Sequence, residues 1–407
     1  MSQFINDREC PEADTIRIET TRLILRPFTK SDLTALSKNK HPVWLCDVTK
    51  EPFDINKPCA SLAVQLKSDG AVIGCVFVGR KPELNDEVEL GYFIADEYQN
   101  NGYATEAGKA MIWWTFDAAG QLMLSSAVRV KNKASRRVIE KLGFVYGGTR
   151  MLSYGGADYE FDYFRLYCIV RFPGPEWDDM NSLYKLYPVE PMEKFFDTRA
   201  DGYNSVIAGI YDYEKFGSCF LKTDETIQIL DIGCGTGVEL EYIWKQAPNA
   251  HIMCLDLSRG MLDLLQKNHP DDHKRITVAE ASYLDWAYPE ETFDIVTSHA
   301  TMHHFYPEEK VEVYRKILGT LKPGGAYIEG DFILNDAIYA EQYRRRHEAI
   351  TEGLSKKAKA SGEYHVDLPL TLDVQIQLLE DAGFNSVEVL EEDFRVHGSR
   401  AILKAVK

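Results

Sequence analysis

The sequence has no long hydrophobic run, no closely spaced pair of cysteines and no excess of basic residues. No stretch approaches the roughly 20 consecutive apolar residues that span a bilayer, and Met1–Glu9 contains no apolar segment of a secretory signal. The eight cysteines are scattered and form no Cys-x-x-Cys motif. We therefore expect neither a disulfide framework nor a zinc site built on cysteines. These absences indicate a protein of the reducing cytoplasm.

Acidic residues outnumber basic ones, and the imbalance lies in the second part of the chain. Of the formal net charge of −17, residues 1–170 contribute −1 and residues 171–407 contribute −16. Such an acidic part repels polyanions, so nucleic acid is not an expected partner. The partners that we expect are small-molecule acceptors, without a membrane, and a homodimer stays open. The neutral first part carries one basic cluster, formed by Arg129, Lys131, Lys133, Arg136, Arg137 and Lys141.

Proline and glycine gather at Phe172–Asp179, where the hydrophobic periodicity stops. This composition is typical of a linker. A chain of 407 residues is long enough for two domains or three. We therefore predict a first domain over residues 1–170, a linker over 171–191 and a second domain over 192–407.

The two predicted domains differ in their order of strands and helices. Before the linker the patterns predict strands at 16–27, 71–78, 88–95 and 125–130, and helices at 105–119 and 135–142. This mixture indicates an α+β fold. After the linker, strand-like runs alternate with helices, at 227–232, 252–257, 276–279, 293–297, 326–332, 386–390 and 401–406. Such alternation predicts a doubly wound α/β fold with a mostly parallel sheet.

A glycine-containing turn joins a strand to a helix in the first domain. The strand at Glu89–Ala95 leads to Gly102 and the small residue Ala104, where a long helix begins. Small residues let the backbone approach a ligand, and the free N–H groups at a helix start bind anions. An ordinary strand-to-helix turn would use the same residues, so this loop alone does not decide between a phosphate site and a structural turn.

The loop, together with Thr21–Phe28 and Asn132–Phe144, resembles the GNAT acetyltransferases, in particular the branch that acetylates ribosomal-protein N-termini. The resemblance covers about residues 15–168 and implies a splayed mixed sheet and acetyl-CoA as cofactor. It implies that the loop binds the CoA pyrophosphate, that Asn132 contacts the pantetheine arm and that a splayed strand positions the thioester. The implied loop residues are Gln99, Asn100, Asn101, Gly102, Tyr103 and Ala104, and the strand residues are Phe93 and Ile94.

Acetyl transfer to an amine needs an oriented thioester and a proton acceptor. By analogy with the family we assign Glu89 as the base, against the alternative of a solvent-facing strand glutamate. Many family members carry a tyrosine, the acid for the leaving thiolate, where this chain has Ile139, and Ser135 is the candidate substitute. The basic cluster either meets the 3′-phosphate of CoA or is a solvated helix face.

A second glycine turn opens the second domain. The strand at Gln228–Ile232 ends in Gly233-Cys234-Gly235-Thr236-Gly237, with Asp231 before the first glycine. A dinucleotide site would have Gly-x-Gly-x-x-Gly and room for a pyrophosphate. A carboxylate before the turn instead suits a ligand with an ammonium group. A further acid, Asp256, ends the next strand, where a carboxylate accepts hydrogen bonds from ribose hydroxyls.

This set, with Glu280-Ala281-Ser282, Phe293–Ser298 and Leu321–Gly325, resembles the class I S-adenosylmethionine-dependent methyltransferases over about residues 192–407. The resemblance implies a Rossmann-like, seven-stranded, mostly parallel sheet. It also implies a role for each motif in binding S-adenosylmethionine. Its implied binding residues are Asp231, Gly233, Cys234, Gly235 and Gly237 for the methionine part, Asp256 and Leu257 for the ribose, Glu280 and Ala281 for the adenine, and Ser298 beside the sulfonium.

Three further features concern the acceptor. Phe195–Tyr203 resembles the lid helix of small-molecule methyltransferases, where Tyr203 either shields the cofactor or packs the helix. His303 and His304 follow the fourth strand and are candidate general bases or loop caps. No metal is expected, because the histidines lack an obvious carboxylate or cysteine set. Arg344–Arg346 either binds an acceptor anion or forms a solvated helix face.

Together the motifs predict a bifunctional transferase that uses acetyl-CoA in its first domain and S-adenosylmethionine in its second. Two alternatives stay open. The first domain could be a CoA-binding or dimerising module without turnover, or the acceptors could be a ribosomal protein and a tRNA.

Overall fold

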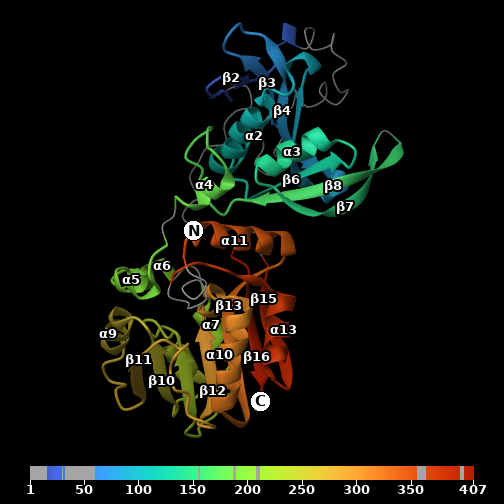
Figure 1. Ribbon diagram of the computed structural model, residues 1–407. Helices are drawn as coiled ribbons and strands as arrows, with labels where there is room; N and C mark the ends of the chain where they lie inside the picture. The colour runs from blue at the N-terminus through green and yellow to red at the C-terminus, as the bar shows by residue number, and fades with distance from the viewer. Residues whose placement is uncertain are drawn as a thin grey trace. The chain divides into compact units, whose positions relative to one another are not determined.

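The computed structural model describes residues 16–29, 31–32, 60–154, 156–186, 189–207, 211–354, 364–394 and 398–407. Contacts divide the chain into two compact units, with the boundary between residues 187 and 188 (Figure 1). Within the described ranges, no helix is both long and apolar enough to cross a membrane.

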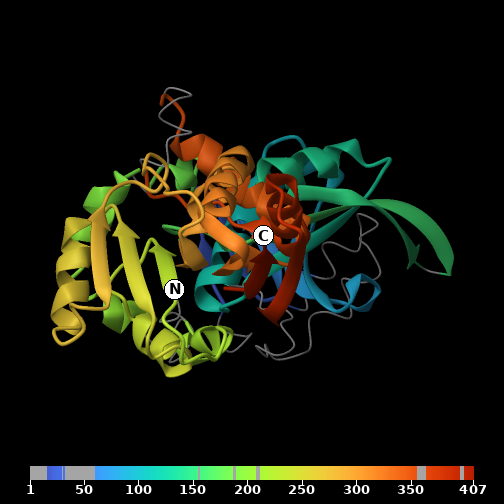
Figure 2. The same cartoon turned by 90° about the horizontal axis from the view of Figure 1, so that it is seen from below.

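The first unit is an eight-stranded sheet with two longer helices, α2 and α3. The strands lie in the order β1-β2-β3-β4-β5-β6-β8-β7, and the long β7–β8 hairpin extends well beyond its neighbours (Figures 1 and 2). The elements are β1 (Ile18–Glu19), β2 (Leu23–Arg26), β3 (Ala60–Leu66), β4 (Val72–Lys81), β5 (Glu87–Ile94), α2 (Tyr103–Trp113), β6 (Met123–Arg129), α3 (Lys133–Lys141), β7 (Val145–Tyr154), β8 (Ala157–Tyr167) and α4 (Met180–Tyr184), with short 3-10 turns at Pro82–Leu84 and Asp96–Tyr98.

Strands β5 and β6 form the parallel pair at the centre of this mixed sheet. They pair at Glu89 and Ser125, near the start of both strands, and no pairing continues toward Ile94. The two strands therefore diverge toward their carboxyl ends, which matches the splay that the resemblance implies. The divergence leaves the carboxyl-terminal end of β5, at Phe93 and Ile94, without a pairing to β6.

One local prediction in the first unit is wrong and another is confirmed. Residues 16–27 do not form one strand but two short antiparallel ones, because Thr20 N–H donates to Leu23 O across a tight turn. The helix predicted at 105–119 is present, but it begins two residues earlier, at Tyr103, and its last residues, Trp114–Ala118, are π-helical. Residues predicted as linker also contact this unit, since Phe172 and Trp177 are buried and Trp177 Nε1 donates to Lys109 O.

The second unit is a doubly wound sheet with the strand order β11-β10-β9-β12-β13-β16-β15, and β14 adds a short pairing to β13. The five strands from β11 to β13 are parallel, and β16 runs antiparallel between β13 and β15. The strands are β9 (Gln228–Ile232), β10 (His251–Asp256), β11 (Ile276–Glu280), β12 (Phe293–His299), β13 (Leu321–Leu334), β14 (Leu370–Thr371), β15 (Ser386–Asp393) and β16 (Arg400–Val406). The helices are α5 (Met192–Asp197), α6 (Tyr203–Ile207), α7 (Tyr213–Ser218), α8 (Leu240–Gln246), α9 (Arg259–Asn268), α10 (Pro307–Thr320), α11 (Ala337–Ile350) and α13 (Leu372–Ala382), with a 3-10 turn at Met302–His304.

Helices cover both faces of the parallel sheet, which explains the nearly continuous apolar strands. One face packs on α10 and α13, through side chains such as Tyr314, Ile317 and Leu379. The other face packs on α7, α8 and α9, where Phe216 is fully buried. The order of strands reverses between β9 and β12, and ligands bind at such a switch point, beyond the carboxyl ends of the strands.

Two helical glycines give a matched test of this packing. A Cβ on Gly217 in α7 would lie 2.5 Å from Tyr242 Cβ and 2.8 Å from its carbonyl carbon, whereas a Cβ on Gly319 in α10 meets nothing within 4 Å. We expect Gly217→Ala to lower the free energy of unfolding by about 1–3 kcal/mol through overpacking. Gly319→Ala should raise it by up to about 1 kcal/mol. Urea denaturation of the full chain measures both, and equal effects of the two variants would contradict the packing.

Candidate functional site

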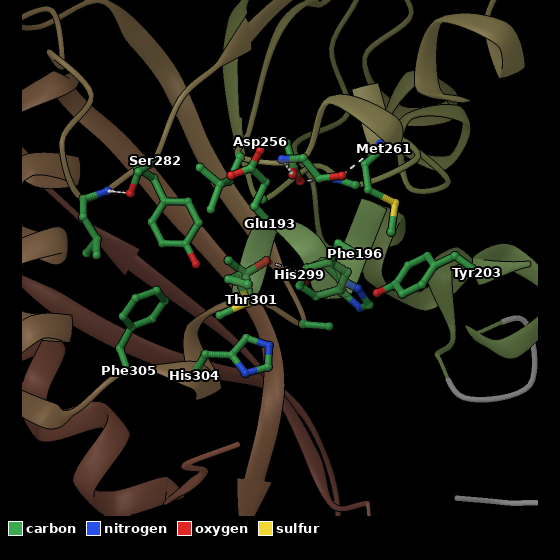
Figure 3. Close-up of a pocket in the computed structure, with 18 residues that line it drawn as sticks. Glu193, Phe196, Tyr203, Asp256, Met261, Ser282, His299, Thr301, His304 and Phe305 are labelled. Carbon is green, nitrogen blue, oxygen red and sulfur yellow. Dashed lines mark hydrogen bonds between the residues drawn. The ribbon is translucent and has the colours of Figure 1, made fainter. Parts of the chain in front are cut away.

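A pocket opens at the carboxyl edge of the second unit's sheet, at the predicted switch point. Its empty space, counted together with the part that is open to solvent, is about 660 Å³. The loops after four parallel strands contribute Gly233 and Gly235, Asp256 to Ser258, Ser282 to Leu284, and His299 to Thr301. Helices α5 and α6 contribute Phe196 and Tyr203, and the hydroxyl of Tyr203 points into the group of lining side chains (Figure 3).

The glycine turn after β9 has no room for side chains at its first and last glycine. Gly233 and Gly237 both have positive φ, and a Cβ on Gly233 would lie 2.5 Å from Thr301 Oγ1. A Cβ on Gly237 would meet Leu265 at 2.9 Å. Gly235 lines the pocket and has open space where its Cβ would be, so its backbone stays accessible to a ligand.

Asp256 is held at the end of β10 by the two loops that surround it. Its Oδ2 accepts a hydrogen bond from Gly235 N–H and its Oδ1 from Ser258 N–H, both at 2.8 Å. Burial raises the pKa of Asp256, and these backbone N–H groups oppose the rise. The carboxylate lines the pocket with its remaining lone pairs free, which suits two hydroxyl donors of a ribose.

Asp231, two residues before the turn, is completely buried, and neither of its carboxylate oxygens has a hydrogen-bond partner among the described residues. Burial and the repulsion of Glu239 raise the pKa of Asp231. Burial also raises the pKa of Glu239 to about 7. Two buried acids without a cation are costly, so this pair fits a ligand that carries an ammonium group.

The other predicted binding residues of this unit fall into two groups. Leu257 lines the pocket beside Asp256, whereas Cys234 is buried behind the turn. Glu280 is exposed and lies 3.4 Å from Arg259 Nη1, and the pocket wall is formed not by Glu280 and Ala281 but by the next residues, from Ser282. Ser298 is buried and its hydroxyl lies 2.6 Å from Tyr327 OH, outside the pocket lining.

The lid helix α5 is fixed to the start of α9 by Asp197. Its Oδ1 accepts hydrogen bonds from Ser258 Oγ and, at 3.1 Å, from Gly260 N–H. This contact places Phe196 over the pocket, where its ring centroid lies 5.9 Å from that of Tyr203. Burial raises the pKa of Tyr203, so its hydroxyl stays neutral. The lid thus places the aromatic rings of Phe196 and Tyr203 at the pocket, and the Tyr203 hydroxyl is its polar group there.

His303 and His304 lie in the turn after β12 and differ in their surroundings. His303 Nδ1 lies 2.6 Å from Asp331 Oδ1, and that carboxylate raises the pKa of His303 despite its burial. His304 lines the pocket, and burial lowers its pKa well below the usual value. His299, which also lines the pocket, is surrounded by aromatic rings, and burial lowers its pKa to about 4.

The loop before α2 in the first unit is held by its own side chains. Gln99 Nε2 donates to Ile94 O and Asn101 Nδ2 donates to Tyr98 O, at 2.9 and 3.1 Å. Asn100 and Gly102 have positive φ. The first backbone bond of α2 joins Glu106 N–H to Gly102 O, so the N–H groups of Tyr103, Ala104 and Thr105 are first-turn donors without a partner inside the helix.

Arg22 supports this loop from β2, a contact that the sequence patterns did not reveal. It donates to Asn101 O, pairs with Glu106 and lies over the Tyr103 ring. The loop and the start of α2 therefore form one hydrogen-bonded unit with a cationic side chain beside it. This arrangement suits an anion.

The predicted catalytic residues of the first unit lie on either side of the splay. Glu89 is buried, pairs with Lys81 at 2.9 Å and accepts a hydrogen bond from Ala127 N–H on β6. Burial raises the pKa of Glu89 and Lys81 opposes the rise. Ser135 Oγ lies 2.8 Å from Tyr92 OH, a residue that sequence reasoning missed. Asn132 caps α3 by accepting from Ser135 N–H.

Two basic groups are paired within their own unit. Arg136 of the basic cluster binds Glu140 and Asp162. Arg344 and Arg345 bind Glu341 on the same turn of α11. The charges of Arg136, Arg344 and Arg345 are therefore balanced by carboxylates.

Two family models match the chain. The model "Acetyltransferase (GNAT) domain" matches residues 22–145, and the model "Methyltransferase domain" matches residues 229–325. The chain joins a GNAT acetyltransferase domain to a methyltransferase domain. The two domains account for the two kinds of sheet and for the separate turns that precede α2 and follow β9.

Similar curated proteins match one domain at a time. Malonyl-[acyl-carrier protein] O-methyltransferase of Priestia megaterium is 31% identical over 27% of this chain and 38% of its own. Cypemycin N-terminal methyltransferase of Streptomyces is 36% identical over 24% of this chain and 39% of its own. The Bacillus subtilis protein named "Putative ribosomal N-acetyltransferase YdaF" is 30% identical over 20% of this chain and 44% of its own. The chain thus spans less than half of the length of each relative.

The buried acids of the methyltransferase domain predict that ligand binding releases protons. In the free protein the raised pKa values of Asp231 and Glu239, the latter about 7, keep part of the pair protonated at about pH 6. A ligand ammonium favours the ionised form, so binding of S-adenosylhomocysteine should release protons and tighten as pH rises from about 5.5 to 7.5.

Calorimetry in buffers of different ionisation enthalpy measures this release. We expect Glu239→Gln to reduce it and Glu280→Gln, at an exposed carboxylate, to leave it unchanged. A binding heat that does not depend on the buffer would contradict the assignment of the acid pair.

Proposed function

We propose that the chain is a bifunctional transferase, which methylates a small molecule with S-adenosylmethionine and acetylates an amine with acetyl-CoA. The observation that carries the methyl-transfer part is the pair of acids at neighbouring strand ends. Asp256 faces the pocket with free lone pairs, and Asp231 is buried without a partner beside the turn that lines it. A single ligand that carries hydroxyl groups and an ammonium group would supply hydrogen-bond donors to both Asp256 and Asp231.

Different residues of the pocket would bind different parts of S-adenosylmethionine. Asp256 would hold the ribose hydroxyls, the Asp231–Glu239 pair would balance the ammonium group, and the backbone at Gly235 would lie against the methionine part. S-adenosylmethionine, when bound, supplies an already activated methyl group, so the protein's task is mainly to hold donor and acceptor in line. The aromatic lid of Phe196 and Tyr203 would exclude water and stabilise a sulfonium through the ring faces.

The acceptor end of the pocket suits a small molecule. His304 and Phe305 form this wall together with Tyr283, and α5 covers the opening. The net charge of −16 over residues 171–407 opposes the approach of a polyanion such as tRNA. A compact acceptor with few charges therefore fits the methyltransferase domain better than a nucleic acid does.

The acetyltransferase part rests on the loop before α2. The free N–H groups from Tyr103 to Thr105, with Arg22 beside them, form an anion site for the CoA pyrophosphate. The open edge of β5 at Phe93 and Ile94 would pair with the pantetheine arm. Acetyl-CoA supplies a thioester, and Glu89 at the base of the splay would accept the proton of the acceptor amine.

A different group must protonate the leaving thiolate, because Ile139 is completely buried at the position of the family's tyrosine. The Tyr92–Ser135 pair at the start of α3 offers two hydroxyls. Burial raises the pKa of Tyr92 to about 12, which keeps this phenol protonated at neutral pH. The same buried Ile139 favours the second candidate function, a CoA-binding domain without turnover.

The methyl-transfer proposal predicts a labelled product that depends on Asp256. The full chain is incubated with S-adenosylmethionine carrying a deuterated methyl group and with a metabolite extract, and the products are analysed by mass spectrometry. Loss of two charge-assisted hydrogen bonds, each worth about 1.5–3 kcal/mol, should weaken donor binding in Asp256→Ala by roughly 10²- to 10⁴-fold.

The matched control is Asp263→Ala, an exposed acid on α9 that pairs with Arg259. It should bind the donor and form product as the unchanged chain does. If Asp256→Ala binds S-adenosylmethionine as tightly as the control does, the assignment of the pocket is wrong.

The acetyltransferase proposal predicts that Gly102 is essential for CoA binding. A valine side chain there would stand between the loop backbone and the pyrophosphate. Gly156→Val is the matched control, because Gly102 and Gly156 have nearly equal positive φ, +81° and +80°, with no close neighbour at the Gly156 Cβ. We expect calorimetry to show CoA binding by Gly156→Val and none by Gly102→Val, with S-adenosylhomocysteine bound by both. Equal CoA affinities would contradict the loop's role.

A further inference from the structure

The two histidines of the turn after β12 lie beside a carboxylate that the sequence places far away. Asp367 Oδ1 lies 3.9 Å from His303 Nε2 and 3.6 Å from His304 Nδ1. One ligand atom from each of the three residues falls within 4.8 Å of the others. The cluster therefore supplies the carboxylate whose apparent absence from the sequence argued against a metal site.

The backbone holds this cluster together across the insertion after β13. Leu368 N–H donates to His303 O at 2.6 Å. Val366 O lies 3.4 Å from His304 Nδ1, a contact that a metal ion bound to this nitrogen would replace. The segment from Val366 to Leu368 thus runs along the histidine turn, with Asp367 directed to both rings. The side chain of Asp367 is 28% exposed, while those of His303 and His304 are 10% and 5% exposed. The carboxylate therefore has room to adjust to a ligand.

A second carboxylate orients His303 from behind. Asp331 Oδ1 lies 2.6 Å from His303 Nδ1 and is fixed by Phe332 N–H at 2.7 Å. A proton on Nδ1 leaves the lone pair of Nε2 directed toward Asp367. Metal-binding histidines commonly donate their second ring N–H to a carboxylate in this way. His303 therefore has one ring nitrogen, Nδ1, bound to a carboxylate and the other, Nε2, available to a metal ion, as metal-binding histidines commonly do.

The spacing is close to that of a metal site. Bonds of about 2.0–2.2 Å place tetrahedral ligand atoms roughly 3.3–3.6 Å apart. The two distances from Asp367 Oδ1, 3.9 and 3.6 Å, exceed this by a few tenths of an ångström, and the three ligand atoms lie within 4.8 Å of one another, so the histidine rings would move closer together around an ion. Two imidazoles and one carboxylate suit zinc and its neighbours in the transition series, and they leave at least one position open.

We propose that His303, His304 and Asp367 bind one divalent transition-metal ion, preferably zinc, at the wall of the methyltransferase pocket. Because His304 lines the pocket, the open position faces the acceptor end, where a water or an oxygen atom of the acceptor would complete the coordination. Asp331 is a positioning residue that acts through His303. Only the acceptor contact rests on the proposed methyl transfer, since the metal set itself does not require it.

The test is metal binding by the full chain, with Co²⁺ as the spectroscopic probe and Zn²⁺ as its competitor. After chelation and gel filtration, we expect one Co²⁺ per chain, visible absorption bands typical of four or five ligands, and displacement by Zn²⁺. Asp367→Asn and His304→Ala should weaken binding at least about tenfold, and Asp367→Glu should restore part of it. Asp331→Asn should weaken binding by about 10–100-fold without removing a ligand.

The matched control is Asp272→Asn, because Asp272 lies 3.8 Å from the buried His269 but has no second histidine in a metal-binding group among the described residues. It should bind metal as the unchanged chain does. The proposal is overturned if the chain binds no Co²⁺ or Zn²⁺ at low micromolar concentration, or if Asp367→Asn binds as the control does. S-adenosylhomocysteine binding, measured on the same samples, separates this failure from a failure of the proposed methyl transfer.

Discussion

The pocket of the methyltransferase domain depends on one glycine turn, which packs tightly between the end of β10 and the loop after β12. Gly233 N–H donates to Leu255 O at 2.7 Å, while Thr301 stands 2.5 Å from where the Gly233 Cβ would be. Only glycine with positive φ fits this space. The turn then presents Gly235 N–H to Asp256, so that the carboxylate, the turn and the loop after β12 converge on one pocket.

The convergence has an electrostatic consequence. Asp231 and Asp256 lie on the adjacent parallel strands β9 and β10, and Asp256 lines the pocket while Asp231 is buried and precedes the glycine turn in the sequence. Burial raises the pKa of each acid, because neither is paired with a cation. Buried acids without a counter-charge lower the stability of the fold. Binding of a methyl donor that carries a positive charge and hydroxyl groups would offset this cost. In the first domain the first-turn N–H groups of α2 would likewise be completed by a ligand of opposite, negative charge.

Much of this could be predicted from the sequence, because backbone requirements leave strong residue patterns. The turns at Gly102 and at Gly233 to Gly237, the acids at strand ends and the alternation of strands and helices follow from glycine, carboxylate and apolar spacing. The family models confirm the two domain types. Contacts between distant segments left no such pattern. The approach of Asp367 to His303 and the support of Asn101 by Arg22 depend on tertiary packing.

One local error has the same origin. Residues 16–27 alternate as a strand does, yet Thr20 closes a turn that the pattern cannot reveal. The place of Ser298 beside the donor is implied by the family resemblance and stays a prediction. Its hydroxyl lies 2.6 Å from Tyr327 OH, a contact that depends on the packing of β12 against β13 and has no signal in the sequence.

The central claim is that one chain holds two separate donor sites, one in each domain. Native mass spectrometry of the full chain with S-adenosylhomocysteine and CoA, added singly and together, tests it most directly. The account predicts one molecule of each ligand per chain and a species that carries both at once. A chain that binds no S-adenosylhomocysteine, or in which either ligand displaces the other, would contradict it.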